Sequence, residues 1–206
     1  MQAAPGHAAD FIVDTLRREP EGSVTLVPIG PLTNIAEAFR RAPDIIGRVR
    51  QIVLMGGAYF EVGNITPAAE FNIYVDPEAA AEVFAAGVPL VVMPLDVTHE
   101  ALTDRAWVEA MRALPGRCGP AVAGWTDFFE RFDTAKYGSL GAPLHDPCTI
   151  AWLLDPDLFQ GRHINVEIEI DGRWTTGMTV ADWWGVSGRP DAGAFDTGRS
   201  TFTSTV

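Results

Sequence analysis

The stretch that decides the fold is "SVTLVPIGPLTNIAEAFRRAP", residues 23–43. Its first part, residues 23–30, is a β-branched apolar run that ends at a glycine, which is typical of a buried strand. Its second part places Leu32, Ile35 and Phe39 at a spacing that brings them to one face of a helix. The stretch therefore predicts a strand, a tight turn and a helix.

The same unit recurs further along the chain. "RQIVLMGG", residues 50–57, and "PLVVMPLDVT", residues 89–98, are apolar runs without alternation, and helical patterns follow at residues 76–87 and 104–114. Apolar strands separated by helices indicate a parallel sheet that is covered on both faces. We expect an α/β fold with a doubly wound, mostly parallel sheet flanked by helices.

The second half reads as more helical, with one addition near its end. Phe128, Phe129 and Phe132 have helical spacing, so we expect them in the core. Residues 163–172 alternate between apolar and polar, and residues 174–184 follow as a second extended candidate. These two segments predict a hairpin or an addition at the sheet edge.

Composition limits the classes of protein and of partner. With 206 residues, of which 47% are hydrophobic, the chain reads as a single domain over residues 1–206. The net charge of -12 disfavours nucleic acid and anionic membrane as partners, and no apolar run approaches the roughly 18 residues of a membrane span. Only Cys118 and Cys148 are present, without a secretory signal, so we expect a cytoplasmic protein and a buried, unreactive Cys148.

The loop between residues 55 and 75 is the first candidate for a binding site. It has about 20 residues where two to six are usual, and it follows a strand end, where ligands gather in open α/β sheets. Asn64, Glu70 and Asn72 offer groups that can hydrogen-bond several sugar hydroxyls, although ordinary turn chemistry explains them equally well. Phe71 and Tyr137 are the better aromatic candidates for a pocket.

The pair His145–Asp146 in "GAPLHDPCTIAWLL", residues 141–154, is the second candidate. An Asp followed by Pro is a strong helix start, and Asp76 with the proline after it has the same form, so we expect both aspartates to act as caps. The three-residue separation of His145 and Cys148 is weak support for a zinc site, and we expect none. For His99 we favour a structural role over a ligand contact.

Together these blocks resemble a known family. "VTLVPIGPLTNIAEAF", "IVLMGGAYFEVGNITPAAEFNIYVDPEAA", "PLDVTH" and "PLHDPCTIAWLL", in this order, are similar to the inosine-uridine-preferring nucleoside hydrolases, from about His7 to Arg189. Members are calcium-dependent N-ribohydrolases with a Rossmann-like, doubly wound core. The resemblance implies Ca²⁺ as cofactor, a small ribonucleoside as substrate, a role in purine or pyrimidine salvage, and a homodimer or homotetramer.

The resemblance also implies roles for the metal and the departing base. Asp146 and the backbone carbonyl of Ile29 match calcium ligands, and His145 matches the catalytic histidine placed toward the leaving base. In the family, a calcium-bound water activated by an aspartate attacks C1′ of the ribose. Carboxylate, carbonyl and hydroxyl oxygens are the ligands that Ca²⁺ prefers.

A further set of residues matches the part of the family site that holds the ribose. Asn64, Glu70 and Asn72 match the groups that bind its hydroxyls, and Met55 and Phe71 match neighbours in the pocket. Because positive charge develops on the sugar during glycoside cleavage, such groups should bind the transition state better than the ground state. Asp76 matches no ligand and is expected to be a plain cap.

One family feature is lacking in these residues. Members begin with a strand and a DxDxGxDD motif, which supplies the general base and most carboxylate ligands, and the 206 residues contain no such motif. We therefore expect a truncated form that lacks the first strands and the final helix of the family and holds calcium weakly. The alternatives are a catalytically inactive ribose-binding or nucleoside-binding fragment or interaction module, and a structural α/β domain without ligand.

Overall fold

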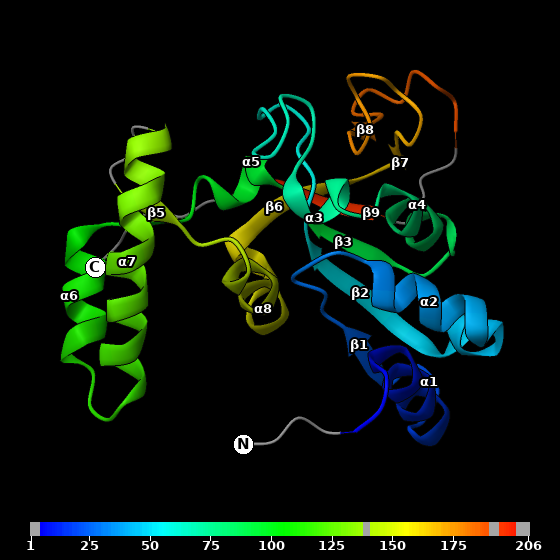
Figure 1. The fold of residues 1–206 in the computed structure, drawn as a ribbon, viewed down its shortest axis with the longest axis horizontal. Coiled ribbons are helices and arrows are strands. Elements are labelled where there is room, and N and C mark those ends of the chain that lie inside the picture. The colour runs from blue at the N-terminus through cyan, green and yellow to red at the C-terminus, as the bar shows by residue number, and fades with distance from the viewer. Residues whose placement is uncertain (1–4, 138–140, 190–193, 201–206) are drawn as a thin grey trace.

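The computed structural model describes residues 5–137, 141–189 and 194–200, with backbone alone for residues 132–137 and 194–200. Tyr137 and Phe132 thus keep their places in a helix, while their side chains lie outside the described part. Figure 1 shows a central sheet with helices packed around it and a helical hairpin standing to one side.

The sheet confirms the expected parallel arrangement. Within the described residues its strand order is β1-β2-β3-β9-β6, with the first four strands parallel and β6 antiparallel to β9. The register joins Ile52 to Leu90 and Met55 to Met93, so β2 and β3 end at the same edge. The five strands are β1 (Val24–Leu26), β2 (Val49–Met55), β3 (Leu90–Met93), β6 (Phe159–Ile164) and β9 (Ala194–Ser200).

Helices cover both faces because the buried strands point apolar side chains in both directions. On one face, Ile52 and Leu54 of β2 lie in a core with three helices. These are α1 (Ala8–Arg18), α2 (Thr33–Arg41) and α4 (Pro77–Ala85), and the short 3₁₀ helix η1 (Pro43–Arg48) precedes β2. On the other face, Val53 packs with Cys148 of α8 (Pro147–Leu154), which the 3₁₀ helix η2 (Pro156–Leu158) follows.

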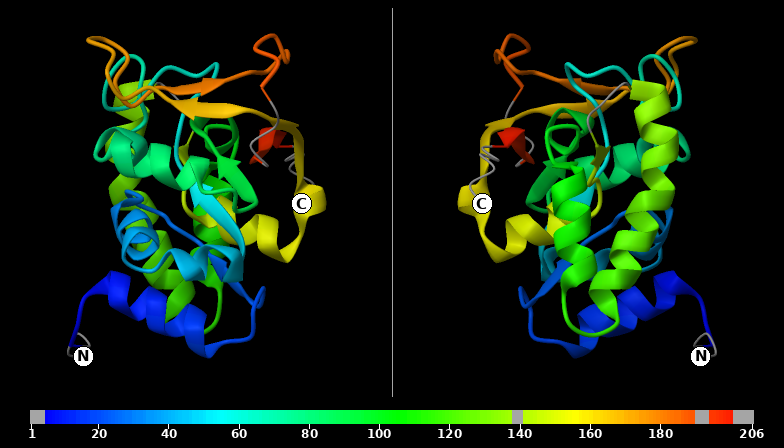
Figure 2. Two further views of the ribbon diagram at one scale, coloured as in Figure 1. Left: turned by 90° about the vertical axis from the view of Figure 1, so that its right-hand side faces the viewer. Right: turned by 90° about the vertical axis from the view of Figure 1, so that its left-hand side faces the viewer.

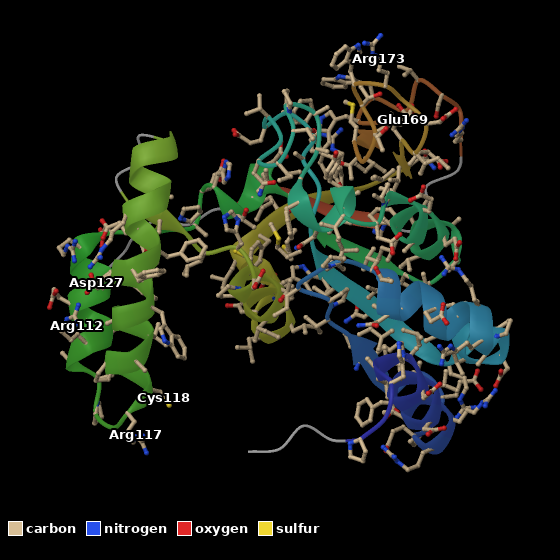
Figure 3. All side chains as sticks on the ribbon, in the orientation of Figure 1. Arg112, Arg117, Cys118, Asp127, Glu169 and Arg173 are labelled. Atoms are coloured by element: carbon tan, nitrogen blue, oxygen red, sulfur yellow. The ribbon has the colours of Figure 1, made fainter. Side chains whose placement is uncertain are left out.

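The hairpin of α6 (Arg105–Ala113) and α7 (Cys118–Tyr137) stands beside the sheet and not on it (Figure 1). It is joined to the body by β4 (Leu102–Thr103) and β5 (Ala142–Pro143), which pair antiparallel. Figure 3 shows Arg112 on α6 and Asp127 on α7 pointing toward each other, and the two side chains form an ion pair.

The position of this hairpin corrects one expectation about the core. Phe128 and Phe129 are 59% and 55% exposed, so they are not core residues. Their spacing does put them on a helix, but periodicity shows which residues share a face and not what lies opposite that face. Because α7 stands away from the five-stranded sheet, these rings do not join the core beneath it.

The predicted hairpin near the end of the chain is confirmed. Strands β7 (Val166–Ile168) and β8 (Thr179–Ala181) pair antiparallel, and Figure 2 shows them at the end of the molecule opposite α1. The Thr179 hydroxyl accepts a hydrogen bond from the Ala58 N–H at 2.9 Å and donates one to the Ala58 carbonyl at 2.7 Å. The hairpin is thereby fixed to the start of the long loop that follows β2.

The glycine beside this contact is required by the backbone. Gly57 has a φ of +87°, and a Cβ placed on it would lie 2.9 Å from Cγ2 of Thr179. Both the left-handed conformation and the close approach favour glycine. Along the described residues, none of the helices combines the length and the apolar character needed to cross a bilayer.

Candidate functional site

A cleft of about 420 Å³ opens at the edge where β1 and β2 end. Its position agrees with the rule that ligands bind outside the carboxyl ends of parallel strands. The eight residues that the resemblance assigns to the site all line this cleft, and the structure adds Ile65 and Phe129. The side chain of Tyr137, the other aromatic candidate, lies outside the described part. The full lining is Ile29, Met55, Asn64, Ile65, Glu70, Phe71, Asn72, Phe129, His145 and Asp146.

Glu70 is the most buried charged residue of the cleft, with 2% exposure. Its side chain is the N-cap of α3 (Phe71–Tyr74), where Oε2 accepts the Asn72 N–H at 2.9 Å and the Gly57 N–H at 3.1 Å. Burial raises the pKa of this carboxyl, and the hydrogen bonds from the surrounding backbone offset part of the rise. The site thus holds a carboxyl group in an enclosed place, where the hydrogen bonds from Gly57 and Asn72 offset part of the cost of burying its charged form.

The two asparagines make structural hydrogen bonds, and Asn72 keeps an acceptor beside the cleft. Asn64 Oδ1 accepts the Phe71 N–H at 2.8 Å, so the expected turn chemistry is present at this residue. Asn72 donates from Nδ2 to the Met55 carbonyl at 3.1 Å. Within the described residues its Oδ1 has no hydrogen-bond donor, which leaves an acceptor on a residue that lines the cleft.

His145 lines the cleft from the segment between β5 and α8. Its Nδ1 lies 2.8 Å from the hydroxyl of Thr98, and its ring meets the ring of His99 edge to face with centroids 5.8 Å apart. Burial, and secondarily the charge of His99, lowers the pKa of His145 to about 4. The imidazole is therefore neutral at pH 7. His99 itself contacts Glu61 at 3.2 Å and does not line the cleft.

Asp146 corrects the expectation that its side chain caps α8. Its backbone is already helical, with φ -60° and ψ -40°, and its carboxylate makes no capping bond. Asp76, which has the same Asp-Pro context, is the plain cap that we expected, because its extended φ of -149° lets its carboxylate accept the Ala79 N–H at 3.1 Å. The Asp146 carboxylate is left to the cleft, and partial burial raises its pKa.

The described residues match a calcium ion in chemistry but not in number. Asp146 and Ile29 offer a carboxylate and a backbone carbonyl, the hard oxygen donors that Ca²⁺ binds, whereas Ca²⁺ takes about six to eight oxygens. In the described ranges no group of three His, Cys, Asp or Glu side chains could hold a metal. These residues alone therefore do not make a calcium site.

Cys148 has the buried, unreactive character that we expected. It is 2% exposed, its thiol lies 2.9 Å from the Leu144 carbonyl, and burial raises its pKa to about 12. The raised pKa makes the thiol unreactive, because the thiolate is the reactive form. His145 lines the cleft, whereas Cys148 lies in the core.

With this geometry in place, the comparison with known proteins is specific. The model of the family described as "Inosine-uridine preferring nucleoside hydrolase" matches residues 1–197. The chain belongs to this family. An uncharacterized protein of Schizosaccharomyces pombe is 55% identical over 181 residues, which cover 88% of this chain and 58% of that protein.

Two proteins named as nucleoside hydrolases show the range of the similarity. The "Pyrimidine-specific ribonucleoside hydrolase RihA" of Salmonella agona is 47% identical over 189 residues, covering 91% of this chain and 60% of the enzyme. The solved structure of the "Purine-Preferring Ribonucleoside Hydrolase from Gardnerella vaginalis" matches with a TM-score of 0.87 at 33% identity, covering 98% of this chain and 63% of that one. The chain thus spans about three fifths of the length of these nucleoside hydrolases.

Proposed function

We propose that this chain carries the ribose-binding side of a ribonucleoside hydrolase, which cleaves the N-glycosidic bond of ribonucleosides to free base and ribose. The observation that carries the proposal is the convergence of Asn64, Glu70, Asn72, His145 and Asp146 on one cleft, although they come from two segments far apart in the sequence. Polar groups that converge in a concave site beside apolar side chains are typical of small-molecule sites.

In the proposed reaction, the bond from C1′ to the base nitrogen breaks and its electron pair stays on the base. The oxygen of a water molecule bonds to C1′, one of its hydrogens remains on the new hydroxyl, and the other ends on the base. Glu70 and Asn72 act on the sugar by accepting hydrogen bonds from its hydroxyls. Those bonds strengthen as the ring becomes oxocarbenium-like, because a fixed carboxylate stabilises developing positive charge.

The metal is part of the proposal and rests on the donor set. Asp146 and the Ile29 carbonyl would be two ligands of a Ca²⁺ ion, which supplies Lewis-acid chemistry when it is bound. The other ligands and the general base would come from outside the residues that the structure describes. The support is that the described residues bring oxygen donors of the right kind to the cleft but too few of them.

The catalytically inactive nucleoside-binding module remains a second candidate. It is favoured by the same shortage of ligands, since ribose recognition needs only the polar residues that line the cleft, whereas activation of a water needs more. We further propose a cytoplasmic homo-oligomer acting in nucleoside salvage. The two cysteines are free in the described structure, as is usual in a reducing compartment.

Calorimetric titration of the 206-residue protein with ribose, 2-deoxyribose and uridine tests the ribose site. We expect ribose and uridine to bind. We expect 2-deoxyribose to bind roughly 5-fold to 100-fold more weakly, because it lacks one hydroxyl and the loss of one buried hydrogen bond costs about 1–3 kcal/mol. Glu70→Gln should weaken ribose binding, and the matched exposed change Glu109→Gln should not. Equal binding of ribose and 2-deoxyribose would contradict the proposal.

An assay of uridine and inosine hydrolysis, in which the released reducing sugar is measured, separates the two candidates. Activity that EDTA abolishes and Ca²⁺ restores would favour the enzyme. Ribose binding without turnover, with or without added Ca²⁺, would favour the binding module.

A further inference from the structure

A single buried hydroxyl holds the cleft histidine. Thr98 is the last residue of α5 (Leu95–Thr98), the one helical turn that follows β3, and it is completely buried. Its Oγ1 lies 2.8 Å from Nδ1 of His145. Within the described residues, neither this hydroxyl nor the imidazole ring has another hydrogen-bond partner.

The geometry allows two arrangements of protons, and they differ in cost. If the hydroxyl donates to Nδ1, its hydrogen is satisfied and the ring proton sits on Nε2. If Nδ1 carries the proton and the hydroxyl accepts, the hydroxyl hydrogen of Thr98 is left buried without an acceptor. A buried donor without a partner costs about 1–3 kcal/mol, so donation by Thr98 is the stable arrangement.

We propose that Thr98 is a positioning residue that fixes His145 as the Nε2–H tautomer. Nε2 is the ring nitrogen that Thr98 leaves available, so His145 presents a neutral N–H donor to a molecule in the cleft. The proposal rests on the proposed function for its purpose. As the bond to C1′ breaks, the departing base gains an electron pair, and a donor aimed at it stabilises that charge.

Helix α5 is well placed for this task because other bonds hold it rigidly. The Asp96 carboxylate accepts the backbone N–H groups of Tyr59 and Phe60, each at 2.8 Å, and of Glu61 at 3.1 Å. The same turn therefore anchors the start of the cleft loop and carries the hydroxyl that orients His145. A catalytic group gains precision when the group that orients it sits on an element with fixed neighbours.

The test reads the tautomer directly and needs neither substrate nor metal. The chain has four histidines, so a two-bond ¹H–¹⁵N correlation spectrum of histidine-labelled protein is simple, and the variant His145→Gln identifies the His145 signals. At pH 8, above the ordinary histidine pKa of about 6.5, we expect His145 to show the Nε2–H pattern alone. Thr98→Ser, which keeps the hydroxyl, should preserve this pattern.

Thr98→Val removes the hydroxyl at nearly constant shape and should shift the pattern toward a mixture of tautomers. Thr103→Val is the matched control, because Thr103 is also buried but donates its hydroxyl to the Ala142 carbonyl. An Nδ1–H pattern in the unaltered protein would overturn the proposal, whether or not any variant folds. So would an unchanged pattern in folded Thr98→Val. Failure of ribose binding would remove the proposed function and leave the tautomer result intact.

Discussion

Glu70 allows a prediction that separates its structural work from its charge. Its Oε2 accepts two buried N–H groups, from Gly57 and Asn72. Glu70→Ala strands both donors at about 1–3 kcal/mol each, so we expect it to lose about 2–6 kcal/mol of unfolding free energy. Glu70→Gln keeps an oxygen acceptor and should stay within about 1 kcal/mol of the parent at pH 5.

The difference in unfolding free energy between Glu70→Gln and the parent should depend on pH, and its direction can be predicted. Because burial raises the folded pKa of Glu70 above its ordinary value of 4.5, the folded state holds this proton at a pH where the unfolded state has released it. Stability from this carboxyl is therefore fully present below pH 4.5 and is lost as pH rises through the folded pKa. Glutamine does not titrate. The stability of the variant relative to the parent should therefore rise as pH increases from 4.5 through the folded pKa of Glu70.

Urea unfolding followed by tryptophan fluorescence at steps between pH 4 and pH 8 measures both effects. The matched control is Glu109→Gln, whose parent side chain is 58% exposed. A constant difference between Glu70→Gln and the parent across this range would refute the reasoning about burial. A loss below 1 kcal/mol in Glu70→Ala would show that the two N–H groups find other acceptors.

Three further outcomes follow from the geometry. Gly57→Ala should destabilise the chain by at least about 1–2 kcal/mol in thermal unfolding, because φ is +87° and the new methyl group meets Thr179. A Tm equal to that of the parent would argue against this close approach. Phe129→Ala should change stability by less than about 0.5 kcal/mol in urea, since the ring is 55% exposed, and a loss typical of a core phenylalanine would place the ring under other side chains. In the native protein, a thiol reagent should label exposed Cys118 and spare Cys148, whose pKa of about 12 keeps it protonated, until denaturant is added; equal labelling would contradict its burial.

The sequence predicted the residues of the cleft better than their local conformations. Strand ends are readable from apolar runs, and parallel strands bring their ends to one edge, so Met55, Glu70 and Asn72 were placed in the right region. The capping difference between Asp76 and Asp146 was not readable, because both precede proline. It depends on the backbone angles, which are extended in φ at Asp76 and helical at Asp146.

Phe129 shows a different limit of sequence reasoning. Its spacing predicted the helix correctly but wrongly placed the ring in the core. The hairpin of α6 and α7 stands beside the sheet, and this ring lines the cleft. The placement depends on contacts between elements distant in the chain. A run of aromatic residues on a helix that also carries several charges was the available signal that the helix is not buried all round.

The bond between Thr179 and Ala58 also bears on the order in which the protein folds. The two residues are 121 positions apart in the chain, yet this contact fixes the first turn of the cleft loop. Contacts of such long sequence separation close late, because the entropy of the intervening chain opposes them until the rest is in place. During synthesis, the sheet core of β1, β2 and β3 can assemble while the cleft is still open. The cleft should therefore be among the last parts to take shape, after residue 179 has left the ribosome.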